Sequence, residues 1–152
     1  MTRTLWTDGS ASPNPGPGGY AVLNDRGEPV RLGHEADSSN IRMEGAALIA
    51  AMEYAGEEEC EIYTDSQFWK SVLEQWAESW ETRGWTKKTG PIKNLEMVKM
   101  IWKLYNEKSV RLRWVQGHAG TELNEMADEW ANRARKGAKL DEESEILKGI
   151  LR

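Results

Sequence analysis

The stretch TLWTDGS at residues 4–10 sets an aspartate, Asp8, directly after a short run of β-branched and aromatic residues. The stretch EIYTDS at residues 61–66 repeats this arrangement around Asp65. Both runs have the composition of a strand that leads into a turn, so each aspartate is predicted at the carboxyl end of its strand. If the two strands are neighbours in one sheet, both carboxylates emerge at the same edge, where the active crevices of α/β proteins commonly form.

Two further carboxylates lie on predicted helices. Glu44 opens the apolar run 46–52, and helical spacing predicts that Glu44 lies on the first turn of a helix, on the side that packs against the sheet. Asp128 lies within a second helical pattern, 123–134, beside its apolar stripe rather than opposite it. Both side chains can therefore face the edge at which the two strands end.

Such a group of carboxylates favours divalent cations. Like charges at close range raise one another's pKa, so crowding is unfavourable unless a cation is bound. Mg²⁺ and Mn²⁺ prefer oxygen ligands, and two such ions about 3.5–4 Å apart can hold the attacking and leaving oxygens of a phosphodiester in line. Each acidic residue alone, in a chain that is 30% charged, would be expected at the solvated surface; their joint occurrence favours a metal site.

The remaining pattern predicts an α/β fold. Turn-rich glycines and prolines join three expected strands into an antiparallel meander, at 4–8, 19–24 and 29–34. Strand 59–64 follows a helix and strand 110–115 follows the helical segment 92–107, so both should pair in parallel and complete a mixed sheet. The run PNPGPGG at 13–19 is typical of a rigid turn, which is either a plain loop or a place where backbone approaches a ligand.

Five ordered motifs resemble those of type I ribonuclease H, which cuts the RNA strand of an RNA/DNA hybrid. They are TDGS followed by NPGPGGYA at 14–21, NIRMEGAALIAAMEYA at 40–55, IYTDSQF at 62–68, WVQGHAG at 114–120 and NEMADEWANRA at 124–134. Their order and spacing make a more specific signal than any short pattern alone.

The resemblance implies a ribonuclease H-like fold, in which a five-stranded mixed sheet of three antiparallel strands plus two parallel ones is flanked by helices. It implies a catalytic domain at 1–135 and leaves 136–152 as a C-terminal tail. Within the tail, 141–151 is expected to form a short amphipathic helix that docks on the domain.

The same resemblance implies the roles of the catalytic residues. Asp8 would bridge two Mg²⁺ ions that bind with the substrate, with Mn²⁺ as a possible substitute. Asp128 would complete the coordination of the ion that activates water. Glu44 and Asp65 would complete that of the ion at the departing 3′ oxygen. The reaction would leave 5′-phosphate and 3′-hydroxyl ends. His118 would be the auxiliary catalytic histidine, although a lone loop histidine is also compatible with a surface residue.

The family distinguishes the two strands of the hybrid by polar contacts in the minor groove. The matching positions here are Ser10, Ser12, Asn14, Asn40 and Gln67. Ile41 replaces the second member of an asparagine pair, which removes one expected hydrogen bond. Asn40 has the alternative role of an N-terminal helix cap.

The DNA strand is expected to contact two further regions. Ser39 and Asn94 match a phosphate pocket, although Asp37 stands where the family often has a basic residue. The segment 76–88 resembles the basic protrusion that grips the DNA strand, through aromatic residues interleaved with basic ones. Its candidate contacts are Trp76, Trp80, Trp85, Lys87 and Lys88. The alternative for at least one of the tryptophans is helix packing.

Composition sets further limits. The net charge is −5, but the stretch 83–113 contains nine basic residues and two acidic ones, so a local surface can still bind phosphate. The single cysteine, Cys60, forms no internal disulfide and indicates a buried residue of a reducing compartment. Without an apolar run of membrane length or a cleavable leader, we expect a cytoplasmic monomer with no membrane partner.

Two other functions compete with a ribonuclease H. One is a hybrid-binding module that has lost catalysis, which the presence of all four carboxylates disfavours. The other is a different nuclease with the same fold, such as a transposase or resolvase core, which the His118 loop and the tryptophan-rich segment disfavour.

Overall fold

Five strands form one mixed sheet in the computed structural model, which describes residues 2–116 and 122–151. The order across the sheet is β3-β2-β1-β4-β5. Their bounds are Arg3–Ala11 (β1), Gly16–Leu23 (β2), Pro29–Ser38 (β3), Cys60–Thr64 (β4) and Val110–Trp114 (β5). β1, β2 and β3 pair antiparallel, whereas β4 pairs parallel with β1 and β5 parallel with β4. The predicted sheet of three antiparallel strands plus two parallel ones is confirmed.

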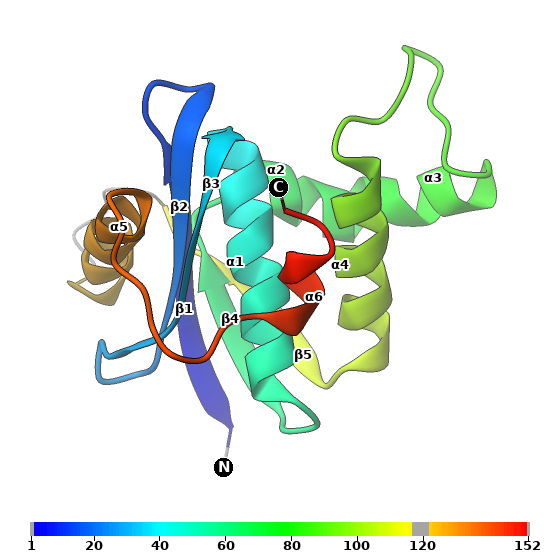
Figure 1. The fold of residues 1–152 in the computed structure, drawn as a ribbon. Coiled ribbons are helices and arrows are strands. Elements are labelled where there is room, and N and C mark those ends of the chain that lie inside the picture. Colours follow the sequence, from blue (N-terminus) through cyan, green and yellow to red (C-terminus); the bar gives the residue numbers. More distant parts are fainter. Residues whose placement is uncertain (1, 117–121, 152) are drawn as a thin grey trace.

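Helices cover both faces of this sheet (Figure 1). α1 (Asn40–Ala55) crosses one face, and α4 (Leu95–Glu107) packs beside it. α5 (Glu122–Arg135) covers the opposite face, over β1 and β2. Because α1 lies between the sheet and other helices, it is apolar on nearly every side, and ten of its residues are buried.

A long helical segment leaves the body of the fold after β4 (Figure 1). It consists of α2 (Gln67–Ser71), the π-helical turn η1 (Val72–Trp76) and α3 (Ala77–Thr82). Its first part is anchored by Trp69, which is fully buried and donates its indole N–H to the carbonyl of Ile41 at 2.8 Å. The segment therefore fixes the start of α1 while projecting α3 outward.

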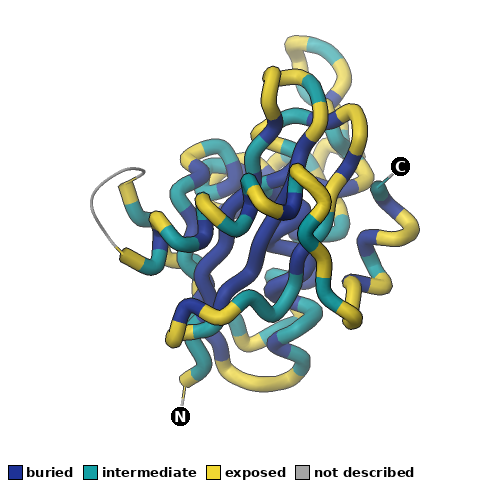
Figure 2. Tube along the Cα trace, turned by 60° about the vertical axis from the view of Figure 1, so that its left-hand side comes forward, coloured by how far each residue is buried: buried dark blue, intermediate teal, exposed yellow. Residues whose placement is uncertain are grey.

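The core lies along the central strands and α1, as the dark blue stretches of Figure 2 show. Cys60 is fully buried and unpaired, which agrees with the expected buried cysteine. Among the described residues, none of the helices is both long and apolar enough to span a bilayer.

Two glycines let the helices approach the sheet closely. A Cβ on Gly9 would lie 2.2 Å from the backbone carbon of Met43 in α1, and one on Gly19 would lie 2.4 Å from the Ala131 carbonyl oxygen in α5. The prediction of a turn over 13–19 is therefore wrong in its second half. The strand β2 begins at Gly16, and the missing side chains of Gly18 and Gly19 leave room for α1 and α5.

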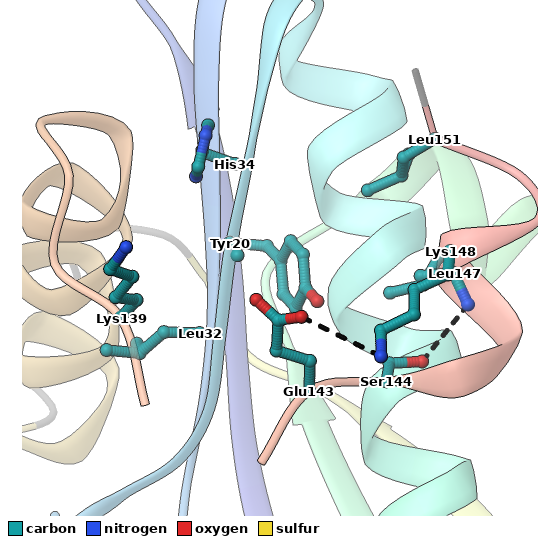
Figure 3. Close-up of a pocket in the computed structure, with 10 residues that line it drawn as sticks. Tyr20, Leu32, His34, Lys139, Glu143, Ser144, Leu147, Lys148 and Leu151 are labelled. Atoms are coloured by element: carbon teal, nitrogen blue, oxygen red, sulfur yellow. Dashed lines mark hydrogen bonds and ion pairs between the residues drawn. The ribbon is translucent and has the colours of Figure 1, made fainter. Parts of the chain in front are cut away.

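The C-terminal segment passes around the edge strand β3 and docks on the far side. Ala138 and Leu140 pack near Leu32 on the α5 face, whereas Leu147 is buried against the core on the α1 face. Figure 1 shows this passage from α5 to α6, and Figure 3 shows Lys139 and Leu147 on opposite sides of the strands.

The helix in this segment is shorter than expected. α6 spans only Glu145–Lys148, so the predicted extent of 141–151 is wrong. The hydroxyl of Ser144 accepts the backbone N–H of Leu147 and thereby starts the helix there. The division of the chain at residue 135 into a catalytic domain and a tail stays a prediction.

Candidate active site

Asp8 lies within a strand, not at its end. β1 continues to Ala11 because Gly9 to Ala11 pair with the glycine-rich start of β2, so the prediction of a strand ending at Asp8 is wrong. The parallel pairing of β1 with β4 nevertheless stops at Trp6, opposite Tyr63. Asp8 therefore stands where the sheet opens, and it is 6% exposed.

Glu44 reaches the same place from α1. Since the helix begins at Asn40, Glu44 lies in its second turn, and the expected position in the first turn is wrong. Gly9 follows Asp8 and lies against the Glu44 backbone, where a Cβ would come within 2.4 Å of the amide nitrogen. This contact is why the carboxylate of a helix can join that of a strand.

Asp65 follows β4 directly, as predicted for the end of a strand. The turn around it is fixed on both sides. The Thr64 hydroxyl accepts the backbone N–H of Ser66 at 3.1 Å, and the Ser66 hydroxyl accepts the N–H of Trp69 at the start of α2. Asp65 is thus held between a buried strand and an anchored helix.

The four predicted carboxylates line one hollow of about 230 Å³, together with Asn124 and Glu125 of α5. Carboxylate oxygens of Asp8, Glu44 and Asp65 lie within 4.8 Å of one another. Asp128 joins them from α5, the helix that covers the opposite face of the sheet. The sheet edge thereby brings together side chains from β1, β4 and both helix layers.

The electrostatics of the hollow favour a cation. Burial, then the charges of Asp65 and Asp128, raise the pKa of Asp8 well above its ordinary value. Burial and then the charge of Asp65 raise the pKa of Glu44 to about 7, although a hydrogen bond from Ser66 acts in the opposite direction. Divalent cations neutralise such a group, and the all-oxygen donor set suits hard ions. The residues present therefore fit a divalent metal site.

A comparison with protein families matches residues 2–136 to the model described as RNase H. The chain belongs to the RNase H family. It is 39% identical over 142 residues to the ribonuclease H of Hahella chejuensis, and the alignment covers 90% of this chain and 95% of that relative. It is 41% identical over 138 residues to the ribonuclease H of Agrobacterium fabrum, with 88% and 92% of the two chains covered.

Solved structures agree with the RNase H assignment. The crystal structure of LC9-RNase H1, described as a type 1 RNase H with the type 2 active-site motif, superposes with a TM-score of 0.74 at 26% identity. The match covers all of this chain and 82% of that one. The expectations of a ribonuclease H-like fold and of an enzyme of the ribonuclease H class are thus confirmed.

The RNase H site contains a residue that the sequence analysis missed. Asn124 is 5% exposed and lines the hollow, one helical turn before Asp128 on the same face of α5. The four-residue spacing of the two side chains could have identified it, because residues so spaced share a helix face. Its amide adds a neutral polar group to the acidic wall.

Two of the minor-groove candidates, Ser10 and Asn40, line the hollow of the carboxylates, and together with the other three they form the rim considered below. The Asn40 side chain accepts the backbone N–H of Ala11 at 2.7 Å, and its own backbone N–H donates to the Asn14 side chain. Ser10 is less accessible, since its hydroxyl donates to Asn132 of α5. Two other candidates are exposed: Ser12, two positions after Ser10, and Gln67, two positions after Asp65.

The capping role considered for Asn40 belongs to its neighbour. The Ser39 hydroxyl accepts the backbone N–H of Arg42 and so caps α1. Asn94 precedes α4 in a left-handed conformation (φ 55°, ψ 37°), and its side chain does not cap that helix. Arg42 connects the two regions, because its guanidinium donates to the Asn94 side-chain oxygen at 3.3 Å.

The tryptophans of the projecting segment combine packing with exposure. Trp76 is 39% exposed, and its ring centroid lies 5.8 Å from that of Trp80, which also contacts the core. Lys99 lies over the Trp85 ring, 5.7 Å from its centroid. Trp76 and Trp80 line a hollow of about 380 Å³, together with Phe68, Lys87, Ile92 and Lys93. Lys88 is exposed in the same loop.

His118 lies outside the described residues, which end at 116 and resume at 122. Its role as auxiliary catalytic histidine stays a prediction.

Proposed function

We propose that this chain hydrolyses the RNA strand of RNA/DNA hybrids as an endonuclease and leaves 5′-phosphate and 3′-hydroxyl ends. The observation that carries the proposal is the convergence of four carboxylates in one hollow of an RNase H-family chain. A catalytically silent hybrid-binding module would have no need to retain this crowded set of charges.

The site would hold two divalent ions, Mg²⁺ with Mn²⁺ as substitute. Asp8 would serve as a ligand of both ions, because it is the most buried of the four carboxylates in the hollow and the charges of both Asp65 and Asp128 act on it. The charge of Asp65 acts on Glu44, which supports one ion shared by these two carboxylates. Asp128 would be a ligand of the other ion. When bound, the ions supply positive charge for the phosphoryl transition state and lower the pKa of the attacking water.

The protein's own residues would fix the positions at which the ions meet the scissile phosphate. Carboxylates fixed on β1, α1, β4 and α5 need no rearrangement when substrate binds, which is the condition for effective electrostatic catalysis. His118 would relay a proton or assist product release from its glycine-rich loop.

The rim would recognise the hybrid. Ser12, Asn14, Asn40 and Gln67 would contact the minor groove, where 2′-hydroxyls distinguish the RNA strand. Ser10 would act through its contact with Asn132. The DNA strand would run over two regions, formed by Ser39 with Asn94 and by Trp76, Trp80, Trp85, Lys87 and Lys88. We expect a monomer, and the free buried Cys60 favours the reducing cytoplasm.

A cleavage panel tests this function. The protein is incubated with RNA/DNA hybrid, duplex RNA and duplex DNA of one sequence, with Mg²⁺ or with EDTA, and the product ends are mapped. We expect cutting of the hybrid's RNA strand alone, only with metal, with 5′-phosphate ends. Binding of the hybrid without cleavage would indicate the silent module, and efficient cutting of duplex DNA would indicate another nuclease of this fold.

A further inference from the structure

Arg42 joins three parts of the chain that are distant in sequence. Its Nε and Nη2 donate to the two carboxylate oxygens of Glu35 on β3, at 2.6 and 3.1 Å. Its Nη1 donates to the Asn94 side-chain oxygen at 3.3 Å, and Nη2 also donates to the Ile150 carbonyl at 2.9 Å. One side chain in the first turn of α1 thus links the edge strand, the start of α4 and the C-terminal segment.

The contact with Arg42 determines which end of the Asn94 amide is available. A carboxamide has an oxygen that accepts and a nitrogen that donates. Since the oxygen is bound by a guanidinium and the side chain does not cap α4, the amide nitrogen is the end left for an acceptor such as a phosphate oxygen. Arg42 therefore presents Asn94 as a donor, while its own backbone N–H is bound by the cap residue Ser39.

Arg42 is poorly suited to bind phosphate itself. The side chain of its partner Glu35 is only 2% exposed, and this buried carboxylate needs the guanidinium as its counter-charge. Most of the N–H groups of Arg42 are already engaged in the bonds described. Its geometry fits a residue that orients another group, since a guanidinium forms a rigid planar fork.

The C-terminal segment docks along α1 and contacts Arg42 through the Ile150 carbonyl. The backbone N–H of Ile146 donates to Glu53 of α1 at 3.1 Å, Leu147 is 2% exposed, and Ile150 is 6% exposed. Figure 1 shows the segment running beside α1 toward the helix's N-terminal end. The Ile150 carbonyl of the docked segment therefore accepts a hydrogen bond from the same guanidinium that donates to Asn94.

We propose that Arg42 is a positioning residue that couples docking of the segment 145–151 to the grip of Ser39 and Asn94 on the DNA strand. This inference rests on the proposed function. Loss of either the guanidinium or the Ile150 carbonyl lets the Asn94 amide turn, and the hybrid is then held less tightly. The chemical step is unaffected, because Arg42 touches neither the reacting phosphate nor the four carboxylates.

The test compares kcat, KM and the unfolding temperature of the full-length chain and its variants on hybrid with Mg²⁺. Arg42→Lys retains the charge but not the fork, so KM should rise about threefold to tenfold, with kcat within about twofold. Arg31→Lys is the matched control. Arg31 is similarly covered and also binds the C-terminal segment, through Glu142 at 3.4 Å, but its hydrogen bonds with Glu142 and the Val30 carbonyl do not involve Asn94. It should leave KM unchanged.

Asn94→Asp provides the second arm, because the new carboxylate still accepts from Arg42 but offers no donor and repels phosphate. KM should rise about tenfold while the unfolding temperature is unchanged or higher. In this background Arg42→Lys, or truncation after Gly149, should raise KM no further. In the parent background the truncation should raise KM about twofold to fivefold.

Three results would overturn the inference: an unchanged KM for both Arg42→Lys and the truncation, an equal rise for Arg31→Lys, or full additivity with Asn94→Asp. If Arg42→Lys does not fold, the truncation in the two backgrounds decides the question. A parent protein that fails to cut hybrid would instead overturn the proposed function, and this inference with it.

Discussion

Glu44 combines a raised proton affinity with a place among the proposed metal ligands. Its pKa is about 7 in the folded chain without metal, against an ordinary value of 4.5, chiefly because of burial and then Asp65. A carboxyl whose pKa is raised by folding stabilises the fold fully below its unfolded pKa. That contribution is lost as the pH rises through the folded pKa. The metal-free protein should therefore lose stability between about pH 4.5 and pH 7.

Glu44→Gln tests this linkage at the residue scale. In EDTA at pH 8, the variant should be more stable than the parent, by up to about 3 kcal/mol if the full shift is realised. The difference should vanish below about pH 4.5, where Glu44 is protonated in both states. Urea unfolding at several pH values measures it. If the parent were as stable as the variant at pH 8, folding would not raise the pKa of Glu44. Mg²⁺ should stabilise the parent more at pH 8 than at pH 5.

Single residues could be predicted when their local sequence carried the signal. Asp8, Glu44, Asp65 and Asp128 were identified before their geometry was known, and the structure brings them into one hollow. The only signal for Asn124 in the sequence is its four-residue spacing from Asp128, which does not show that the side chain is buried. Its burial results from the way α5 lies on the sheet, a tertiary property.

At the scale of elements, the approach of α1 to β1 decides whether the carboxylates meet. Gly9 permits this contact, because a Cβ would lie 2.2 Å from the Met43 backbone carbon and 2.4 Å from the Glu44 nitrogen. Both neighbours are backbone atoms of a buried helix, so neither can move aside without displacing α1. The site therefore depends on a position that contributes no side chain.

Gly9→Ala should push α1 away from β1. We expect a loss of about 1–3 kcal/mol of unfolding free energy from overpacking, with weaker Mg²⁺ binding and slower cleavage. Gly149→Ala is the matched control. Its φ is −86°, and the nearest atom to a new Cβ is the Ile146 carbonyl oxygen at 3.6 Å, so stability should stay equal or rise slightly. Chemical denaturation and metal titration measure both effects. Equal stability of Gly9→Ala and the parent would contradict this account of the contact.

Element types were more predictable than element bounds. Composition and spacing indicated all five strands, because β-branched runs and turn residues are local signals. The extension of β1 past Asp8 depends on pairing with β2, and the short α6 depends on the cap at Ser144. Neither partner can be recognised from a window of neighbouring residues. The apolar pattern also does not predict the π-helical turn at 72–76.

At the scale of the whole molecule, charge is unevenly distributed. The chain carries −5 overall, whereas nine of its basic residues fall within 83–113. Affinity for a hybrid depends on local contacts with phosphate, so an acidic total is compatible with binding. Asp37 is exposed, two positions before the cap residue Ser39, and it places a negative charge near the proposed phosphate pocket.

Asp37→Arg should tighten hybrid binding at low salt. It should also steepen the dependence of log affinity on log salt by about one unit, as expected for one added phosphate contact. Glu57→Arg makes the same change of charge beyond the opposite end of α1, at an exposed position, and should leave the slope nearly unchanged. Fluorescence anisotropy over a salt series measures both. Equal affinity and slope for the parent and Asp37→Arg would leave Asp37 a plain surface residue.

The overall topology could be predicted further than the path of the C-terminal segment. Helical crossovers before β4 and β5 require parallel pairing, and turn-rich connections favour an antiparallel meander, so the mixed sheet followed from chain order. The route of 136–151 around β3, and its contact with Arg42, depend on hydrogen bonds to two elements that are distant in sequence, β3 and α1. Those contacts have no counterpart in the local pattern.

We propose that the four carboxylates hold the ions with which the chain cuts RNA in a hybrid. The most direct measurement is the hybrid cleavage rate with Mg²⁺ for the parent, Asp8→Asn, Asp65→Asn and the exposed control Asp25→Asn, with hybrid binding measured alongside. We predict that both site variants lose at least about a thousandfold in rate while they still bind hybrid, and that the control retains the parent rate. A rate within about tenfold of the parent for either site variant would contradict the account.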